Sequence, residues 1–154
     1  MNYEHPKRKT KVVFVQLGSP SEPTTKALRK YLRKFLGDPR VIDINPWLWK
    51  IILNCFVLPF RPQKSAKLYA RIWDGKSFPL ITNTRDFTIN VSEELKKIDP
   101  EGFVEVNHAF LLSPPYVNEV YDSWEEDLKK GVGATKLLVI PMFPQYSEST
   151  IASG

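Results

Sequence analysis

Uninterrupted apolar runs in the chain are separated by longer segments in which apolar residues recur at helical spacing. Residues 11–18 read KVVFVQLG and residues 136–144 read KLLVIPMFP, runs typical of strands buried on both faces. A third stretch, residues 103–112 (FVEVNHAFLL), is also strand-like. The pattern therefore predicts three strands with helical connections between them.

Five segments are predicted to be helical, and they are residues 25–37, 46–58, 62–73, 84–98 and 114–131. The first ends at a glycine, Gly37, and carries a single apolar stripe of Ala27, Leu28, Tyr31, Leu32, Phe35 and Leu36. The fourth is expected to turn one face inward, formed by Phe87, Val91, Leu95 and Ile98.

Strands joined by helix-length connections predict an α/β fold, a doubly wound parallel sheet flanked by helices on both faces. In such sheets ligands bind beyond the carboxyl ends of the strands. Here those ends lead into residues 18–23, 111–115 and 142–150, which we expect to meet at one rim.

The segment PWLWKIILNCFVLPFRP, residues 46–62, is far more apolar than its surroundings. Asn45 and Pro46 are typical of a helix start, and Pro59 is expected to end the helix. A helix from Trp47 to Leu58 spans only roughly 18 Å, whereas a bilayer crossing needs about 20 apolar residues.

Three interpretations of this segment remain open. Its apolar side chains could simply pack in the core, form a surface that lies on a membrane, or form one wall of a cleft for a flat apolar molecule with carboxylates. Arg61 follows the segment directly, and its guanidinium has the forked geometry that binds a carboxylate.

Composition indicates a folded domain, with 42% hydrophobic and 25% charged residues in a chain of 154. We expect a basic tail at residues 1–10 and one domain over residues 11–154. The net charge of +5 suits an acidic partner, anionic lipid or a carboxylate-bearing ligand. Cys55 is the single cysteine and no apolar run precedes Val12, so a cytoplasmic location is expected.

Few residues are suited to catalysis. The loop LGSPSEP lacks the glycine spacing of a dinucleotide site and the GK[ST] of a phosphate loop. The two histidines are His5 in the tail and His108 near the end of a predicted strand. Without an acid nearby in sequence, His108 is better explained as a satisfied polar residue than as a base or metal ligand.

Four motifs follow one another along the chain, and they are VFVQLGSPSEPT, YLRKFLGDPRVID, LPFRPQKSAKLYARIW and PMFPQYSEST. In this order they resemble the N-terminal half of ferrochelatase, the enzyme that inserts ferrous iron into protoporphyrin IX to make haem, and the similarity runs from about Lys11 to Gly154. The resemblance implies a Rossmann-like chelatase domain facing a porphyrin cleft. It also implies that the family's second domain, with its catalytic histidine and glutamate, is absent from this chain.

The resemblance further suggests which residues line the porphyrin site. Arg61 matches a family arginine that pairs with a porphyrin propionate, and Leu17 matches a residue that approaches the porphyrin face. Phe78 and Phe110 stand where the family has a serine and a basic residue, which removes polar contacts. The signature loop contributes Phe143, Tyr146 and Ser147. An apolar lip, which would border the pocket or rest on the membrane, is expected to comprise Trp47, Trp49, Ile52 and Phe56.

The resemblance thus predicts a ferrochelatase-type domain that binds porphyrin or haem and, as an isolated chain, has little or no activity. Ferrous iron and protoporphyrin IX are the implied substrates. No permanent cofactor is expected, and Glu148 at the matching loop position argues against an iron-sulfur cluster.

The expected partners are the missing C-terminal half or a second copy, and peripheral contact with the inner face of the membrane, but no nucleic acid. Two alternatives remain. The chain could be a non-catalytic tetrapyrrole-binding or regulatory module, or a homodimeric half-length chelatase in which His108 faces the metal.

Overall fold

The computed structural model describes residues 9–42 and 44–143, and these form two compact units. Of the described residues, one unit comprises 9–16, 83–110 and 115–142, and the other comprises 17–42, 44–82, 111–114 and 143. We refer to them as the sheet unit and the helical unit and describe each by itself.

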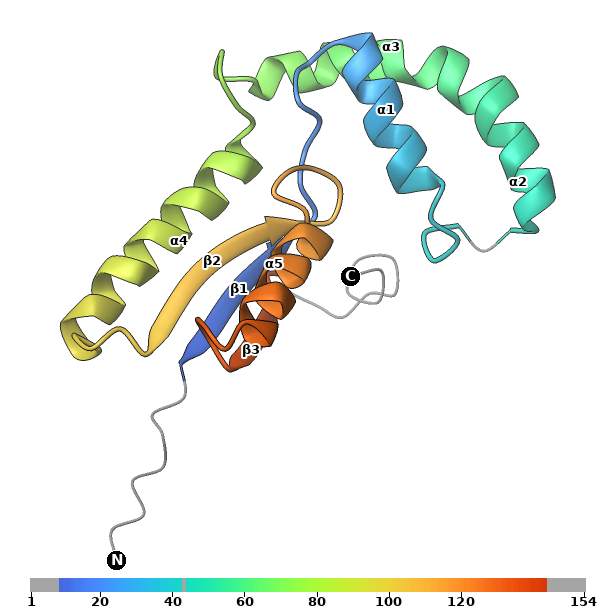
Figure 1. Cartoon of the computed structure of the whole chain (residues 1–154). Helices are drawn as coiled ribbons and strands as arrows, with labels where there is room; N and C mark the ends of the chain where they lie inside the picture. Colours follow the sequence, from blue (N-terminus) through green and yellow to red (C-terminus); the bar gives the residue numbers. More distant parts are fainter. Residues whose placement is uncertain (1–8, 43, 144–154) are drawn as a thin grey trace, which may run out of the picture. The chain divides into compact units, whose positions relative to one another are not determined.

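The sheet unit contains three parallel strands, β1 (Thr10–Gln16), β2 (Val104–Phe110) and β3 (Lys136–Pro141), in the order β2-β1-β3 (Figure 1). Thr10 pairs with Val104 on one side and with Lys136 on the other, and the register continues along the strands. From β1 the chain crosses to β2 on one side of it, and from β2 it crosses back over β1 to β3 on the other side. With right-handed crossovers this reversal places the two connecting helices on opposite faces of the sheet.

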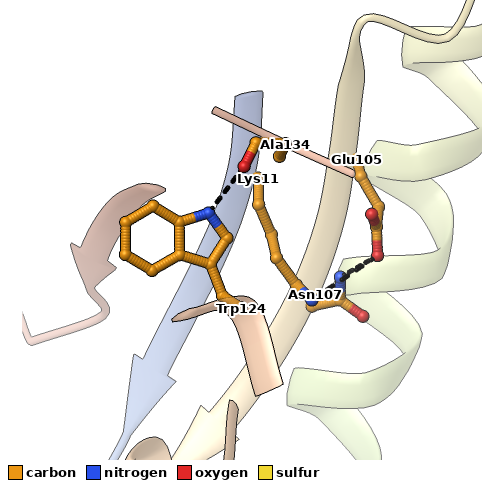
Figure 2. A network of polar contacts seen from close by, with 5 residues as sticks. All are labelled: Lys11, Glu105, Asn107, Trp124 and Ala134. Carbon is orange, nitrogen blue, oxygen red and sulfur yellow. Dashed lines mark hydrogen bonds and ion pairs between the residues drawn. The ribbon is translucent and has the colours of Figure 1, made fainter. Parts of the chain in front are cut away.

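The connecting helices are α4 (Pro79–Ile98) and α5 (Val117–Lys129). Phe87 of α4 meets Phe14 of β1 edge to face, with ring centroids 5.1 Å apart. On α5, the indole N–H of Trp124 donates to the carbonyl of Ala134 at 2.8 Å (Figure 2). These contacts fix each helix to the sheet unit, and the α/β fold with a parallel sheet flanked by helices is confirmed.

A polar contact also joins β1 to β2 across the ladder. The Glu105 carboxylate accepts a hydrogen bond from the Asn107 side chain at 2.7 Å and pairs with Lys11 at 3.9 Å (Figure 2). Because Glu105 is exposed, such an ion pair contributes only about 0–1 kcal/mol. The buried side chains of β1, Val12 to Val15, provide the larger part of the stabilisation of this strand.

Two expectations about the burial of side chains in this unit were only partly right. The all-apolar β3 was predicted to be buried on both faces, but Leu138, Val139 and Ile140 are 37–50% exposed, because β3 is an edge strand among the described residues. On the predicted inner face of α4, Phe87 contacts Phe14 and Val91 and Leu95 are half-buried, but Ile98 is 80% exposed. The most buried side chains of this helix are instead Thr84 and Thr88, and the Thr88 hydroxyl donates to the Thr84 carbonyl at 2.7 Å, which satisfies it without solvent.

The helical unit consists of α1 (Thr25–Leu36) and a curved rod formed by α2 (Pro46–Ile52), a π-helical turn (Leu53–Val57), α3 (Leu58–Tyr69) and a 3₁₀ turn (Ala70–Ile72) (Figure 1). α1 matches its prediction closely. Its buried residues are Leu28, Tyr31 and Leu36, and Gly37 follows its last turn.

The prediction that Pro59 ends the apolar helix was wrong. The chain continues through the π turn, in which the amide of Leu58 donates to the carbonyl of Leu53. Pro62 lacks an N–H and would leave the Leu58 carbonyl without its helical donor, but Arg29 of α1 donates its Nε to that oxygen at 3.2 Å. A side chain from another helix thus replaces the missing backbone bond.

Candidate functional site

The apolar segment begins with a side-chain cap on α2. The Asn45 side-chain oxygen accepts hydrogen bonds from the amides of Trp47 at 3.1 Å and Leu48 at 3.4 Å. Pro46 occupies the first turn, where its missing N–H costs nothing. The cap and the proline start the helix as predicted.

Most of the large side chains of this segment face outward. Trp47 is 80% exposed, Phe56 64% and Phe60 68%. Trp49 and Ile52 are half-buried, and the indole N–H of Trp49 donates to the Leu36 carbonyl at 2.7 Å. Core packing therefore accounts for only part of the segment, principally Leu53 and Leu58, which pack with Leu36.

We call the exposed side chains Trp47, Leu48, Ile51, Phe56 and Phe60 the apolar lip. Among the residues described, no helix has both the length and the apolar character needed to span a membrane. Arg61 follows the lip directly, is exposed, and forms no ion pair with a carboxylate of the described part of the chain.

Phe78 lies in an aromatic cluster of the helical unit and is 2% exposed. Its ring meets Trp73 at 4.7 Å and Tyr69 at 5.4 Å, both edge to face. The preceding turn is held by Asp74, whose carboxylate accepts hydrogen bonds from the amides of Ser77 and Lys76, and these bonds lower its pKa. Phe78 is therefore positioned as a packing residue.

Tyr31 of α1 also packs against this aromatic cluster. Its hydroxyl donates to the Gly18 carbonyl at 3.3 Å, and its ring lies 6.4 Å from that of Tyr69. Burial, and then the neighbouring Tyr69, raise the pKa of Tyr31 above its usual value. Tyr31 therefore remains a neutral hydrogen-bond donor at physiological pH.

The loops after β1 and β2 meet, as the sheet topology predicted. The Leu112 amide donates to the Leu17 carbonyl at 3.0 Å, and the Ser19 amide donates to the Ser113 hydroxyl at 3.3 Å. Leu17 borders a small cavity of about 130 Å³. The third loop lies mostly outside the described residues, and with it Tyr146, Ser147 and Glu148; Phe143, at its start, is half-buried.

Phe110, at the end of β2, is fully buried, with its ring 5.5 Å from that of His108. Burial, together with the positive charge of Arg85, lowers the pKa of His108. No cluster of three or more metal-ligating side chains occurs in the part of the chain that the structure describes. His108 is accordingly neutral at pH 7, and it belongs to no such cluster.

A larger cavity of about 430 Å³ lies in the helical unit and was missed by the sequence analysis. It is bordered by Trp49 and by two cations, Arg33 and Lys50. One signal was available in the sequence. Residues 17–82 contain twelve lysines and arginines but only four aspartates and glutamates, a formal net charge of +8 against +5 for the whole chain.

Comparison with known proteins agrees with the motifs. The family model for ferrochelatase matches residues 9–154, nearly the whole chain. The chain belongs to the ferrochelatase family. A ferrochelatase of Idiomarina loihiensis is 42% identical over 142 residues, which are 92% of this chain and 37% of that protein.

Two further relatives have the same partial coverage. A ferrochelatase of Marinobacter nauticus is 39% identical over 99% of this chain and 40% of its own length. A coproporphyrin III ferrochelatase of Enterococcus faecalis is 42% identical over 95% of this chain and 43% of its own length. The chain therefore spans about two fifths of the ferrochelatases that it matches.

Proposed function

We propose that this chain forms the porphyrin-binding half of a ferrochelatase, which inserts ferrous iron into protoporphyrin IX. One observation carries the proposal beyond the family: an exposed apolar lip is followed directly by Arg61, whose guanidinium has no carboxylate partner in the described part of the chain. A flat apolar ring with carboxylates at one edge is the ligand that such a surface complements.

The apolar lip supplies the contact with the macrocycle in this proposal. Aromatic side chains such as Trp47 and Phe56 offer large flat surfaces that lose little conformational freedom on binding. Arg61 supplies a charge-assisted, forked hydrogen bond to a propionate, and bonds of this type are the stronger ones in proteins. Binding and orientation of the porphyrin are thus assigned to this half.

Iron insertion also requires a base that accepts two pyrrole protons. We assign the catalytic base to none of the described residues. His108 is a neutral imidazole on β2, and Phe78 and Phe110 are buried rings without titratable groups. We therefore propose that the isolated chain binds porphyrin and inserts little or no iron.

The first experiment is a titration of the purified chain with protoporphyrin IX, followed by Soret absorbance. Arg61→Ala should weaken binding roughly tenfold, the loss expected when a charge-assisted hydrogen bond is removed. Arg71→Ala, an exposed arginine of the same unit, is the matched control and should leave affinity unchanged. Equal affinities for the wild type and Arg61→Ala would remove the proposed role of this arginine.

The second experiment measures insertion of ferrous or zinc ions into the bound porphyrin. Binding without insertion is the proposed result, and it also describes the alternative of a non-catalytic tetrapyrrole-binding module. Adding the C-terminal half of a relative in trans distinguishes the two: recovered turnover supports the chelatase half. Coproporphyrin III serves as the comparison substrate, because the name of the Enterococcus faecalis relative specifies it.

We also propose that the apolar lip makes peripheral contact with a membrane. Exposed tryptophan and phenylalanine beside a strong excess of positive charge are typical of surfaces that lie in the lipid interface. The exposed thiol of Cys55 offers a direct test. An environment-sensitive fluorophore on Cys55 should shift to shorter wavelength with anionic vesicles, and an unchanged spectrum would refute the contact.

A further inference from the structure

The cavity of about 430 Å³ in the helical unit is separate from the apolar lip and Arg61, and it has the size of a small-molecule site. Its apolar lining comes from the end of α1, the connection that follows and the start of the rod, and consists of Pro39, Ile42, Ile44, Pro46, Trp49 and Leu53. We call it the α1–α2 cavity. Its walls suit a hydrocarbon chain.

The inner wall of the α1–α2 cavity is preformed. Leu53 is 5% exposed and packs with Leu36 and Leu58. The Trp49 ring is held at one end by the 2.7 Å hydrogen bond from its indole N–H to the Leu36 carbonyl. A ligand that enters therefore meets side chains that are already ordered, which lowers the entropic cost of binding.

Two cations border the same cavity, Arg33 from α1 and Lys50 from α2. Both are exposed, and neither has a carboxylate partner among the described residues. The other polar side chain of the lining is Asn54, whose NH₂ group donates to the Lys50 carbonyl at 2.7 Å. Among the residues that the structure describes, no acidic side chain borders the cavity. The ligand it complements is thus apolar at one end and anionic at the other.

The surroundings indicate where such a ligand comes from. Trp47, Leu48 and Ile51, on the same helix as Trp49 and Lys50, are 80%, 54% and 55% exposed. The segment that contains the cavity carries the formal charge of +8. Both features favour the surface of an anionic bilayer, in which acyl chains and phosphates occur together.

We propose that the α1–α2 cavity binds one anionic phospholipid, with an acyl chain against Trp49 and Leu53 and the phosphate between Arg33 and Lys50. This inference rests on the membrane contact proposed above and adds a specific lipid site to it. Its consequence is saturable binding of one lipid molecule, dependent on these two cations, which the positive charge of the surface alone does not produce.

The test uses the whole chain and dihexanoylphosphatidylglycerol below its critical micelle concentration, measured by isothermal titration calorimetry. We expect saturable binding of one lipid per chain. Dihexanoylphosphatidylcholine, which has the same chains but no net charge, should bind at least about tenfold more weakly.

Two double variants distinguish binding at the lipid site from general attraction of the anionic lipid to the positively charged surface. Arg33→Gln with Lys50→Gln removes the cavity cations and should weaken lipid binding at least about tenfold. Lys64→Gln with Arg71→Gln removes the same charge from exposed positions outside the cavity lining and should change affinity less than about twofold. Equal loss in both doubles would overturn the proposal, as would the absence of saturable binding.

A third variant tests the acyl chain. Ile44→Trp fills the cavity but keeps both cations, and Ile44 is 44% exposed, so the substitution need not disturb the core. It should weaken lipid binding as strongly as the loss of the cations. Unchanged affinity would show that no chain enters the cavity and would contradict the proposal.

The failure of this proposal can be told from failure of the membrane contact. The monomeric lipid assay contains no bilayer, whereas the Cys55 fluorophore reports vesicles only. Suppose that both double variants bind phosphatidylglycerol vesicles equally well and that neither has a lower affinity for the monomeric lipid. The membrane contact then stands and the lipid site is refuted. If the cavity variants lose affinity for protoporphyrin IX but not for the lipid, the cavity binds the porphyrin and the lipid proposal is likewise refuted.

Discussion

Replacing Phe78 with serine, the residue that the family resemblance places at this position, tests whether this ring holds the helical unit together. The side chain is 2% exposed and has edge-to-face contacts with Trp73 and Tyr69. Complete burial of a phenylalanine contributes about 1.5–3 kcal/mol, and each aromatic pair adds about 0.5–1.5 kcal/mol. With the cavity left behind, the total agrees with the ~3–5 kcal/mol measured for loss of a buried phenylalanine ring.

We therefore expect Phe78→Ser to lower the free energy of unfolding by about 3–5 kcal/mol. Urea denaturation followed by tryptophan fluorescence is a suitable assay, because Trp73 contacts the ring directly. Phe60→Ser is the matched control, since Phe60 lies in the same unit and is 68% exposed, and its effect should stay within about 0.5 kcal/mol. A loss below about 1 kcal/mol for Phe78→Ser would refute the packing role.

Two further predictions concern the cap of α2 and the titration of His108 in the sheet unit. Asn45→Ala removes the acceptor for the amides of Trp47 and Leu48, so urea denaturation should show a loss of about 1 kcal/mol; no loss would mean that the cap is dispensable. Because burial and then Arg85 lower the pKa of His108, its contribution to stability is present above about pH 6.5, the usual histidine value, and is lost as pH falls through the folded-state pKa. Arg85→Gln should raise the pKa of His108 in an NMR titration, and an unchanged pKa would exclude this charge as a cause.

Local sequence patterns predicted the elements whose environment is set by their own residues. The run at β1 is buried as expected, because strands pair with it on both sides. The stripe on α1 turned Leu28, Tyr31 and Leu36 inward, since helical spacing alone determines which side chains share a face. The parallel sheet followed from the length of its connections.

The misses arose where a distant residue decides the outcome. The rod does not end at Pro59, since the chain passes through a π-helical turn there, and at Pro62 the side chain of Arg29, from another helix, bonds the Leu58 carbonyl in place of the missing amide. The apolar run of β3 could not reveal that the strand lies at an edge of the described sheet. The α1–α2 cavity is bordered by residues of two helices and of the connection between them, an arrangement that no local pattern encodes.

The apolar segment was the most informative signal about the site, but of the four lip residues predicted only Trp47 and Phe56 are exposed, and Trp49 and Ile52 are half-buried. Trp47 and Phe56 face outward, so the interpretation of the segment as pure core filling was insufficient. The roles of Leu17, Arg61 and Phe143 at the porphyrin remain predictions, as do those of Tyr146 and Ser147, which lie outside the described residues.

The most direct test of the central claim is the affinity of a lip double variant, Trp47→Ser with Phe56→Ser, for protoporphyrin IX. Both side chains are mostly exposed, at 80% and 64%, so their loss leaves the fold intact and any change in binding is direct. The account predicts saturable binding by the wild type and at least about tenfold weaker binding by the variant, the effect expected of central aromatic contacts. Equal affinity of the two proteins would contradict the account.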